Sequence, residues 1–200
     1  MKQLNLLDIS KNLLESEARA GATPAVIKTV TDESSGEKSS LLLTSLNNGT
    51  HILFPSAFCE GAKGAEEYDM NDFIGECLVV KAKGALTGMW IDNMFLLNCE
   101  KLLIKGAGKG KIDVSAAEEL VAEGVKLIGT DADCIAIEGM ENEVYGVFAE
   151  ADCLVLEGLN LEKADPGKYF LMAQPVLLEG AEAAPCRAVL ADGYIYWNKS

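Results

Sequence analysis

The sequence predicts a single α/β domain with a mixed sheet and a βαβ unit, and three observations support this prediction. Apolar residues make up 49% of the 200 residues and are spread along the whole chain, which suits one hydrophobic core. Short β-rich runs alternate with two amphipathic helical segments in the second half of the chain. No repeat, low-complexity tract or linker divides the sequence. Residues 1–200 are therefore expected to form one domain.

The first half of the chain is predicted to contain mainly strands and loops. A Gly/Pro turn signal at residues 18–24 ends the first strand segment, and residues 33–38 form a plausible hairpin turn. A short helical piece is expected within the long loop at residues 64–75. The predicted strands are residues 4–10, 25–32, 39–46 and 76–84.

The second half of the chain carries the βαβ signal. A helix is predicted at residues 113–124, where Asp113 or Ser115 can cap the free N–H groups and Gly124 can end the helix. A second helix is predicted at residues 142–152. Strand, helix and strand at this spacing imply right-handed crossovers and neighbouring parallel strands. The predicted strands are residues 101–106, 125–132, 153–159, 168–180 and 186–193.

Charge and composition exclude several classes of protein. The formal net charge of −14 repels phosphate backbones and anionic lipid surfaces, so neither a nucleic acid nor a membrane is an expected partner. The chain shows no signal-peptide pattern and no apolar run of membrane-span length. Its six cysteines lack disulfide or zinc-ribbon spacing. We therefore expect a cytoplasmic protein with reduced thiols.

The segment SLNNGTHILFPSAFCEG, residues 45–61, contains His51, the only histidine of the chain. Its Gly-Thr-His-x-x-x-Pro spacing is typical of a metal-binding loop. However, Asn48-Gly49 is also a strong β-turn signal, and on that interpretation Thr50 and His51 simply begin the next strand. The residues of this segment alone leave both interpretations open.

The order of motifs resembles the cyclase family, which includes bacterial kynurenine formamidase. Members carry His-x-Gly-Thr-His-x-Asp-x-Pro, and residues 47–55 of this chain have Asn-Asn-Gly-Thr-His-Ile-Leu-Phe-Pro. Residues 6–10 are similar to the family's opening strand, and residues 116–132 to its helix and following strand. Residues 154–190 match the C-terminal block, with the family's glutamate at Glu157. The resemblance covers nearly the whole chain.

This resemblance implies a swivelling β/β/α fold and a homo-oligomer, either a dimer or a tetramer. It also implies hydrolysis of a small amide, ester or lactone by a water molecule that zinc or manganese activates. The family's metal ligands are two loop histidines, a loop aspartate, a later histidine and the glutamate. The corresponding residues here are Asn47, His51, Leu53, Tyr145 and Glu157.

Only His51 and Glu157 keep donor groups of the family's type, so they are the candidate catalytic and metal-binding residues. A further family histidine, which assists proton transfer, is replaced by Ala57. Because a catalytic zinc site normally takes three protein ligands and a water molecule, the sequence predicts a remodelled, metal-poor site. The predicted pocket-lining residues are Asn47, Leu53, Ala57, Cys134 and Tyr145.

Residues in flanking loops offer a way to complete a mononuclear site, namely Cys59, Glu60, Asp131, Asp133 and Cys134. The simpler interpretation is that the thiols are inert and the aspartates cap loops. A Cys134–His51 dyad stays open as well. Trp90 and Trp197 are expected in packing or subunit contacts.

Two function hypotheses follow from the sequence. The first is a cyclase-like or arylformamidase-like hydrolase of a small amide, ester or lactone with a remodelled site. The alternative is a catalytically inactive paralogue that binds a small molecule or a partner in the same pocket.

Overall fold

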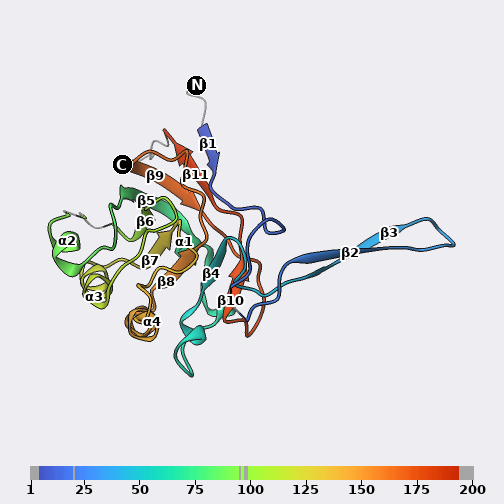
Figure 1. The fold of residues 1–200 in the computed structure, drawn as a ribbon, viewed down its shortest axis with the longest axis horizontal. Coiled ribbons are helices and arrows are strands. Elements are labelled where there is room, and N and C mark those ends of the chain that lie inside the picture. Colours follow the sequence, from blue (N-terminus) through green and yellow to red (C-terminus); the bar gives the residue numbers. More distant parts are fainter. Residues whose placement is uncertain (1–4, 20, 95, 97–98, 194–200) are drawn as a thin grey trace, which may run out of the picture.

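The computed structural model describes residues 5–19, 21–94, 96 and 99–193 (Figure 1). Its strands are β1 (Asn5–Asp8), β2 (Val26–Thr31), β3 (Lys38–Leu43), β4 (His51–Leu53), β5 (Ile74–Lys81), β6 (Lys101–Lys105), β7 (Leu127–Thr130), β8 (Leu154–Glu157), β9 (Gly167–Met172), β10 (Ala183–Pro185) and β11 (Val189–Asp192). Within the described residues, nine strands form one curled mixed sheet in the order β1-β11-β9-β5-β6-β7-β8-β4-β10. Strands β2 and β3 form a separate antiparallel hairpin, as predicted.

Four neighbouring strands, β5 to β8, run parallel at the centre of the sheet. Helix α3 (Val114–Ala122) connects β6 with β7, and α4 (Glu141–Glu150) connects β7 with β8. These helices and the short α2 (Gly88–Asp92) cover one face of the sheet (Figure 1). The predicted α/β class, with a mixed sheet and a βαβ unit, is therefore confirmed.

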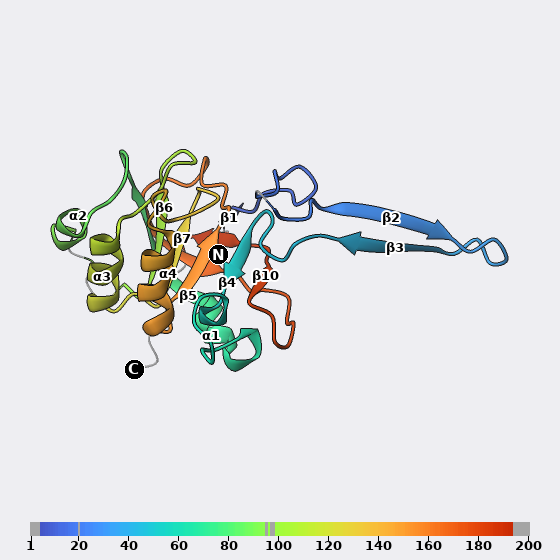
Figure 2. The same cartoon turned by 60° about the horizontal axis from the view of Figure 1, so that its bottom comes forward.

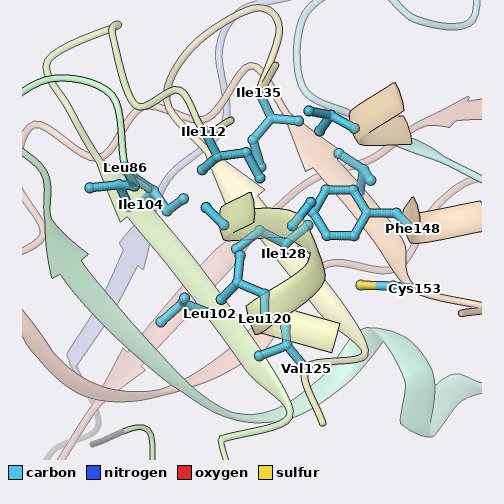
Figure 3. Close-up of a cluster of buried hydrophobic side chains, with 14 of the residues drawn as sticks. Leu86, Leu102, Ile104, Ile112, Leu120, Val125, Ile128, Ile135, Phe148 and Cys153 are labelled. Carbon is cyan, nitrogen blue, oxygen red and sulfur yellow. The ribbon is translucent and has the colours of Figure 1, made fainter. Parts of the chain in front are cut away.

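Successive side chains of the central strands alternate between two hydrophobic clusters. In the first cluster, Leu102 of β6 packs with Leu120 of α3 and Phe148 of α4 (Figure 3). The next residue, Leu103, belongs to the second cluster together with Leu190 of β11. The central strands are thus buried on both faces, which explains why their sequences are continuous apolar runs.

Helix α3 begins and ends where its sequence predicts. The carboxylate of Asp113 accepts a hydrogen bond from the backbone N–H of Ala116 at 2.8 Å, so Asp113 is the N-cap. Ser115 instead donates its hydroxyl to Asp113 and accepts from Gly88, which ties α3 to α2. The chain leaves the helix at Gly124 with φ of +86°.

Several short elements were not predicted from the sequence. They include β10, which is three residues long, and helix α2. Strand β4 does begin at His51, as the β-turn interpretation of Asn48-Gly49 expected. The short helical piece predicted at residues 64–75 is present as the 3₁₀ turn η2 (Ala65–Glu67) and the helix α1 (Met70–Phe73), whereas the 3₁₀ turn η1 (Pro55–Ala57) was not predicted. The strand predicted at residues 168–180 ends at Met172.

Four further predictions concern the membrane, the cysteines and the tryptophans. Along the described ranges, no helix has the length and apolar character needed to span a bilayer. All six cysteines lie in the described part of the chain and none is paired; Cys77 and Cys153 are buried, whereas Cys59 is exposed. Trp90 packs against the first cluster, and Trp197 lies outside the described residues.

Candidate functional site

The candidate site lies where β4 meets the carboxyl end of β8. The two strands are antiparallel, and their register places His51 directly opposite Glu157. The loop after β7 and helix α4 add Ile135 and Tyr145 to the same place. The carboxyl ends of parallel strands are the usual location of ligand sites in open α/β sheets, which favours this place over the others.

Two glycines allow the loop before β4 to approach the end of β8. Gly49 has φ of +61° and Gly158 has φ of +68°. A Cβ atom on Gly158 would lie 2.0 Å from the carbonyl oxygen of Gly49, so the approach requires glycine there. The Thr50 hydroxyl joins the start of β4 to the end of β8, because it donates to Gly158 O at 2.6 Å. It also accepts from Lys11 N at 2.8 Å, which ties the N-terminal loop to the same place. The Asn-Gly turn therefore leads directly into the strand that carries His51.

Glu157 is completely buried and both of its carboxylate oxygens have partners. Oε1 accepts hydrogen bonds from the Tyr145 hydroxyl at 2.6 Å and from the Ile135 backbone N–H at 2.7 Å. Oε2 pairs with the guanidinium of Arg19, and His51 Nε2 lies 3.5 Å from the same oxygen. A carboxylate offers about four lone-pair positions, and Tyr145, Ile135 and Arg19 fill three of them.

Arg19 is the site residue that the sequence analysis missed. It precedes the hairpin in a loop, and it reaches Glu157 across 138 residues of sequence with its side chain 29% exposed. Burial alone would raise the pKa of Glu157, but the neighbouring His51, Arg19 and Tyr145 outweigh burial and hold this pKa below its usual 4.5. Burial opposes the charge of Arg19, and the adjacent Glu157 nevertheless raises the pKa of the guanidinium. The pair is therefore ionised.

His51 is buried and presents only one ring nitrogen to a ligand. Its Nδ1 lies 3.1 Å from the Gly49 carbonyl oxygen, and because a carbonyl can only accept, Nδ1 carries the hydrogen. Nε2 has no hydrogen-bond partner among the described residues, since 3.5 Å to Glu157 is too long for one. Nε2 is therefore the nitrogen that remains available.

Tyr145 acts as a hydrogen-bond donor at this site. Burial raises the pKa of its phenol, and the nearby Glu157 and Cys134 raise it further, so the hydroxyl keeps its proton. The Cys134 Sγ lies 3.2 Å from that hydroxyl, and the ring stacks on Phe58 at 4.2 Å between centroids. Within the described chain no hydrogen bond joins Cys134 to His51, so the structure does not bring the possible dyad together.

A cavity of about 180 Å³ opens beside His51. The predicted pocket residue Asn47 and the predicted catalytic residue His51 line it. Lys11 and Asp133 form an ion pair of 2.6 Å at its wall. The other lining residues are Ser16, Glu17, Arg19 and Gly49. A larger cavity of about 380 Å³ lies at the amino ends of β5 and β6, away from His51 and Glu157, and we therefore do not assign it to the site.

The remaining predicted site residues lie outside the wall of this cavity. Leu53 packs in the first hydrophobic cluster, and Ala57 ends the 3₁₀ turn η1 half-buried. The Asp131 carboxylate accepts a backbone hydrogen bond. Cys59 and Glu60 are exposed. The structure thus brings together His51, Glu157, Tyr145 and Cys134, with Asn47 at the cavity.

This arrangement of donors does not fit the metal ion that the resemblance implies. In the described ranges, no three His, Cys, Asp or Glu side chains are placed to hold a metal ion, whereas a catalytic zinc site takes three protein ligands. The Glu157 oxygens accept from Tyr145 and Ile135, and the Arg19 guanidinium beside them would repel a second cation. The residues present therefore support hydrogen bonding and charge pairing at this site.

The chain is similar to several known proteins, although no family model matches it. It is 30% identical over 165 residues to the kynurenine formamidase of Sphingopyxis alaskensis, which covers 76% of this chain and 79% of that protein. It is 28% identical over 173 residues to the kynurenine formamidase of Erythrobacter litoralis, with 80% of each chain covered. A structure described as a potential metal-dependent hydrolase with cyclase activity matches with a TM-score of 0.83 at 22% identity, over 96% of this chain and 100% of that chain. This likeness confirms the predicted fold.

Proposed function

The chain belongs to the cyclase family that includes the kynurenine formamidases, and on this premise we propose that it binds a small organic molecule in the family's pocket without metal-dependent hydrolysis. The relatives support a cyclase-like or hydrolase-like function for the family. The observation that carries the finer proposal is the contact of the buried Glu157 with Arg19, Tyr145 and the Ile135 N–H. Arg19 already places a positive charge at this carboxylate, which disfavours a metal ion there.

The cavity limits the ligand to a small molecule with oxygen acceptors. Its volume of about 180 Å³ is below the roughly 300–1,000 Å³ of pockets for drug-sized ligands. Arg19 uses one nitrogen for Glu157 and has further N–H donors at the cavity wall. The amide N–H group of Asn47 adds a donor, and Nε2 of His51 adds an acceptor. A carbonyl or carboxylate oxygen is the ligand group that Arg19 and Asn47 would bind.

Each residue of the site has a distinct part in binding. The guanidinium of Arg19 attracts the ligand's oxygen, and Nε2 of His51 contacts a second polar atom. Glu157 holds Arg19, and Tyr145 holds Glu157 from the helix side. Because Glu157 and His51 are buried, water is excluded behind the ligand and the polar contacts are strengthened.

A direct test combines metal analysis with a hydrolysis assay. Protein purified without added metal is incubated with an aryl formamide, an aryl ester and a lactone. Each substrate is tested once with a chelator and once with added zinc or manganese. We expect a metal content far below one ion per chain and background turnover in every condition. Turnover that metal stimulates and a chelator abolishes would contradict the proposal.

A second candidate function is hydrolysis of a small amide, ester or lactone without a metal ion. The observation that favours it is the unpartnered Nε2 of His51, which could take a proton from an attacking water molecule. Turnover of this kind would be insensitive to chelators and would disappear in His51→Ala and Glu157→Gln. Rates that both variants leave unchanged would exclude it.

We further propose that the partner of the chain is a second copy, bound through the arm that β2 and β3 form. All twelve strand residues of the arm are exposed, and it projects from the body of the molecule (Figure 2). Its exposed apolar side chains are Val26, Ile27, Val30, Leu41, Leu42 and Leu43. A two-stranded hairpin is marginally stable alone in water, so the arm needs a partner.

The accessible surface area supports a partner of dimer size. The chain exposes 11789 Å², whereas a compact protein of 21.3 kDa exposes about 9,100 Å². The excess of roughly 2,700 Å² on one chain is large enough to supply its half of an obligate homodimer interface, which buries about 2,000–5,000 Å² in total over both chains. Two copies related by a twofold axis could bury both arms with one self-complementary contact.

Light scattering after gel filtration tests this dimer. We expect twice the mass of 21.3 kDa for the unchanged chain and a monomer for Ile27→Lys/Leu42→Lys, whose residues are cross-strand neighbours. The control is Leu6→Lys, because Leu6 is equally exposed but lies on β1 at the edge of the main sheet. A monomeric unchanged chain would overturn the proposal.

We also propose a cytoplasmic location. All six cysteines, each in the described part of the chain, are unpaired, and Cys59 is exposed. Free thiols of this kind persist in reducing compartments. Cell fractionation with an antibody to the chain would check the location.

A further inference from the structure

The geometry points to a specific task for Arg19. Its guanidinium supplies the permanent positive charge beside Glu157. In a metal-dependent hydrolase a bound metal ion would supply that charge, whereas here a side chain of the protein itself does so. Arg19 balances the charge of the buried Glu157 and so acts as a positioning residue for this carboxylate and for Tyr145, which donates to it. The inference rests on the proposed function, because it explains how a site without a metal ion retains the buried glutamate.

Glu157 needs a full positive charge beside it. Its side chain is 0% exposed, and an ionised carboxylate without a counter-charge is costly in such a place. The Tyr145 hydroxyl and the Ile135 N–H are good donors, but both are neutral groups. Among the described residues, the side chain with a permanent charge in contact with Glu157 is Arg19.

The chain offers no second cation for this task in the described part of the cavity wall. Lys11 lines the same cavity, but its ammonium group pairs with Asp133 at 2.6 Å. A guanidinium is also better suited than an ammonium group, since it is always charged and more weakly hydrated. Because the Arg19 side chain remains 29% exposed, it keeps part of its contact with water at the cavity.

The charge of Arg19 determines which way the neighbouring hydrogen bonds run. An ionised Glu157 can only accept, so Tyr145 donates to it. Without Arg19 the buried carboxylate would keep only two neutral donors, the Tyr145 hydroxyl and the Ile135 N–H, and these do not balance its charge.

This role predicts an asymmetry that an ordinary ion pair would not show. Glu157→Gln leaves a cation at the cavity wall, where water can solvate it, whereas Arg19→Ala leaves a buried anion. We therefore expect Arg19→Ala to lower the thermal midpoint by roughly 5–15 °C, and Glu157→Gln to lower it by less. The double variant Arg19→Ala/Glu157→Gln should recover much of the loss, because neither charge remains.

The decisive experiment is chemical rescue of Arg19→Ala by free guanidinium ion. Thermal midpoints are measured at neutral pH in about 20 mM guanidinium chloride, a concentration too low to denature, and in equal sodium chloride. We expect guanidinium, but not sodium, to raise the midpoint of Arg19→Ala. The unchanged chain and the double variant should not respond. Arg19→Lys, which keeps the charge, should lose less than Arg19→Ala.

Each outcome of this experiment decides the inference. Equal losses in the two single variants, or no response of Arg19→Ala to guanidinium, would overturn it. If Arg19→Ala does not fold, a folded double variant supports the role of charge and an unfolded double variant contradicts it. Metal-stimulated turnover would defeat the proposed function instead, and because these midpoints involve no turnover, the two failures can be told apart.

Discussion

The carboxyl end of β8 buries charged groups, whereas the β2–β3 arm exposes apolar ones. Glu157 is 0% exposed and His51 1%, while Val30 is 65% and Leu41 64% exposed. Each buried oxygen of Glu157 has a partner within the chain, whereas the apolar side chains of the arm stay exposed although they pair across the hairpin. A charged group can therefore be buried in this molecule where partners satisfy it, and apolar groups stay exposed where no sheet or helix covers them.

The largest expected effect is at the close approach that builds the site. Gly158→Ala would place a Cβ atom 2.0 Å from the Gly49 carbonyl oxygen, so we expect a loss of about 3–5 kcal/mol in the free energy of unfolding. The control is Gly139→Ala, which shares a positive φ but meets nothing within 4 Å and should cost about 1–2 kcal/mol. Urea unfolding measures both losses. Similar values would show that the loop carrying Gly49 moves to make room for the added Cβ atom.

The hydrogen bond of Tyr145 gives the next effect. Tyr145→Phe removes a 2.6 Å bond to the buried Glu157, and we expect a loss of about 1.5–3 kcal/mol. Tyr68→Phe is the matched control, because the buried Tyr68 hydroxyl has no partner among the described residues. That variant should be as stable as the unchanged chain or more so. Equal losses for both variants in urea unfolding would mean that the hydrogen bond to Glu157 does not contribute to the free energy of unfolding.

A smaller effect compares the same substitution in the two regions. Val155 lies on β8 at 2% exposure, so Val155→Thr should cost about 1–2 kcal/mol by burying a hydroxyl. Val30 lies on the arm at 65% exposure, so Val30→Thr should change the free energy of unfolding by less than about 0.5 kcal/mol. Urea unfolding at protein concentrations below the dissociation constant of the dimer measures the effect within one chain. A costly Val30→Thr would mean that the arm packs on its own body.

The smallest expected effect is the change in the free energy of unfolding with pH near neutrality. Burial raises the pKa of Glu157, but His51, Arg19 and Tyr145 hold it below its usual 4.5 in the folded chain. The stabilisation by Glu157 is therefore fully present above the unfolded value of 4.5 and is lost as pH falls through the lower folded pKa. The stability difference between the unchanged chain and Glu157→Gln should narrow only in acid. A difference that stays constant through the acid range would contradict the depressed pKa.

Much of the fold could be predicted because its signals are local. Asp113 and Gly124 mark the ends of α3, and the continuous apolar runs mark the central parallel strands. Strand β4 could be placed only from the Asn-Gly turn before it, because three residues carry no periodicity. Strand β10 escaped prediction because it contains Pro185, a residue disfavoured in strands. Hydropathy could not place the hairpin outside the main sheet, since its strands look like any other half-buried pair.

The candidate site could be predicted only where a motif marked it. His51 and Glu157 were found through the family pattern, and the structure places them opposite each other. Arg19 could not be found, because it lies in a loop without periodic pattern and its partner is 138 residues away. An arginine is a common surface residue, and only the three-dimensional contact distinguishes this one. The sequence offered one indirect signal of Arg19. The family's other metal-binding donors are missing, so a buried Glu157 requires a positively charged side chain in place of the metal ion.

The pairing of β1 with β11 has a consequence for biosynthesis. Asn5 pairs with Asp192, and this contact joins the two ends of the described chain. A polypeptide emerging from the ribosome therefore cannot complete this sheet until β11 has been translated, and β1 must stay unpaired until then. Molecular chaperones that shield nascent apolar segments should consequently raise the yield of this protein more than they would for one built from neighbouring contacts.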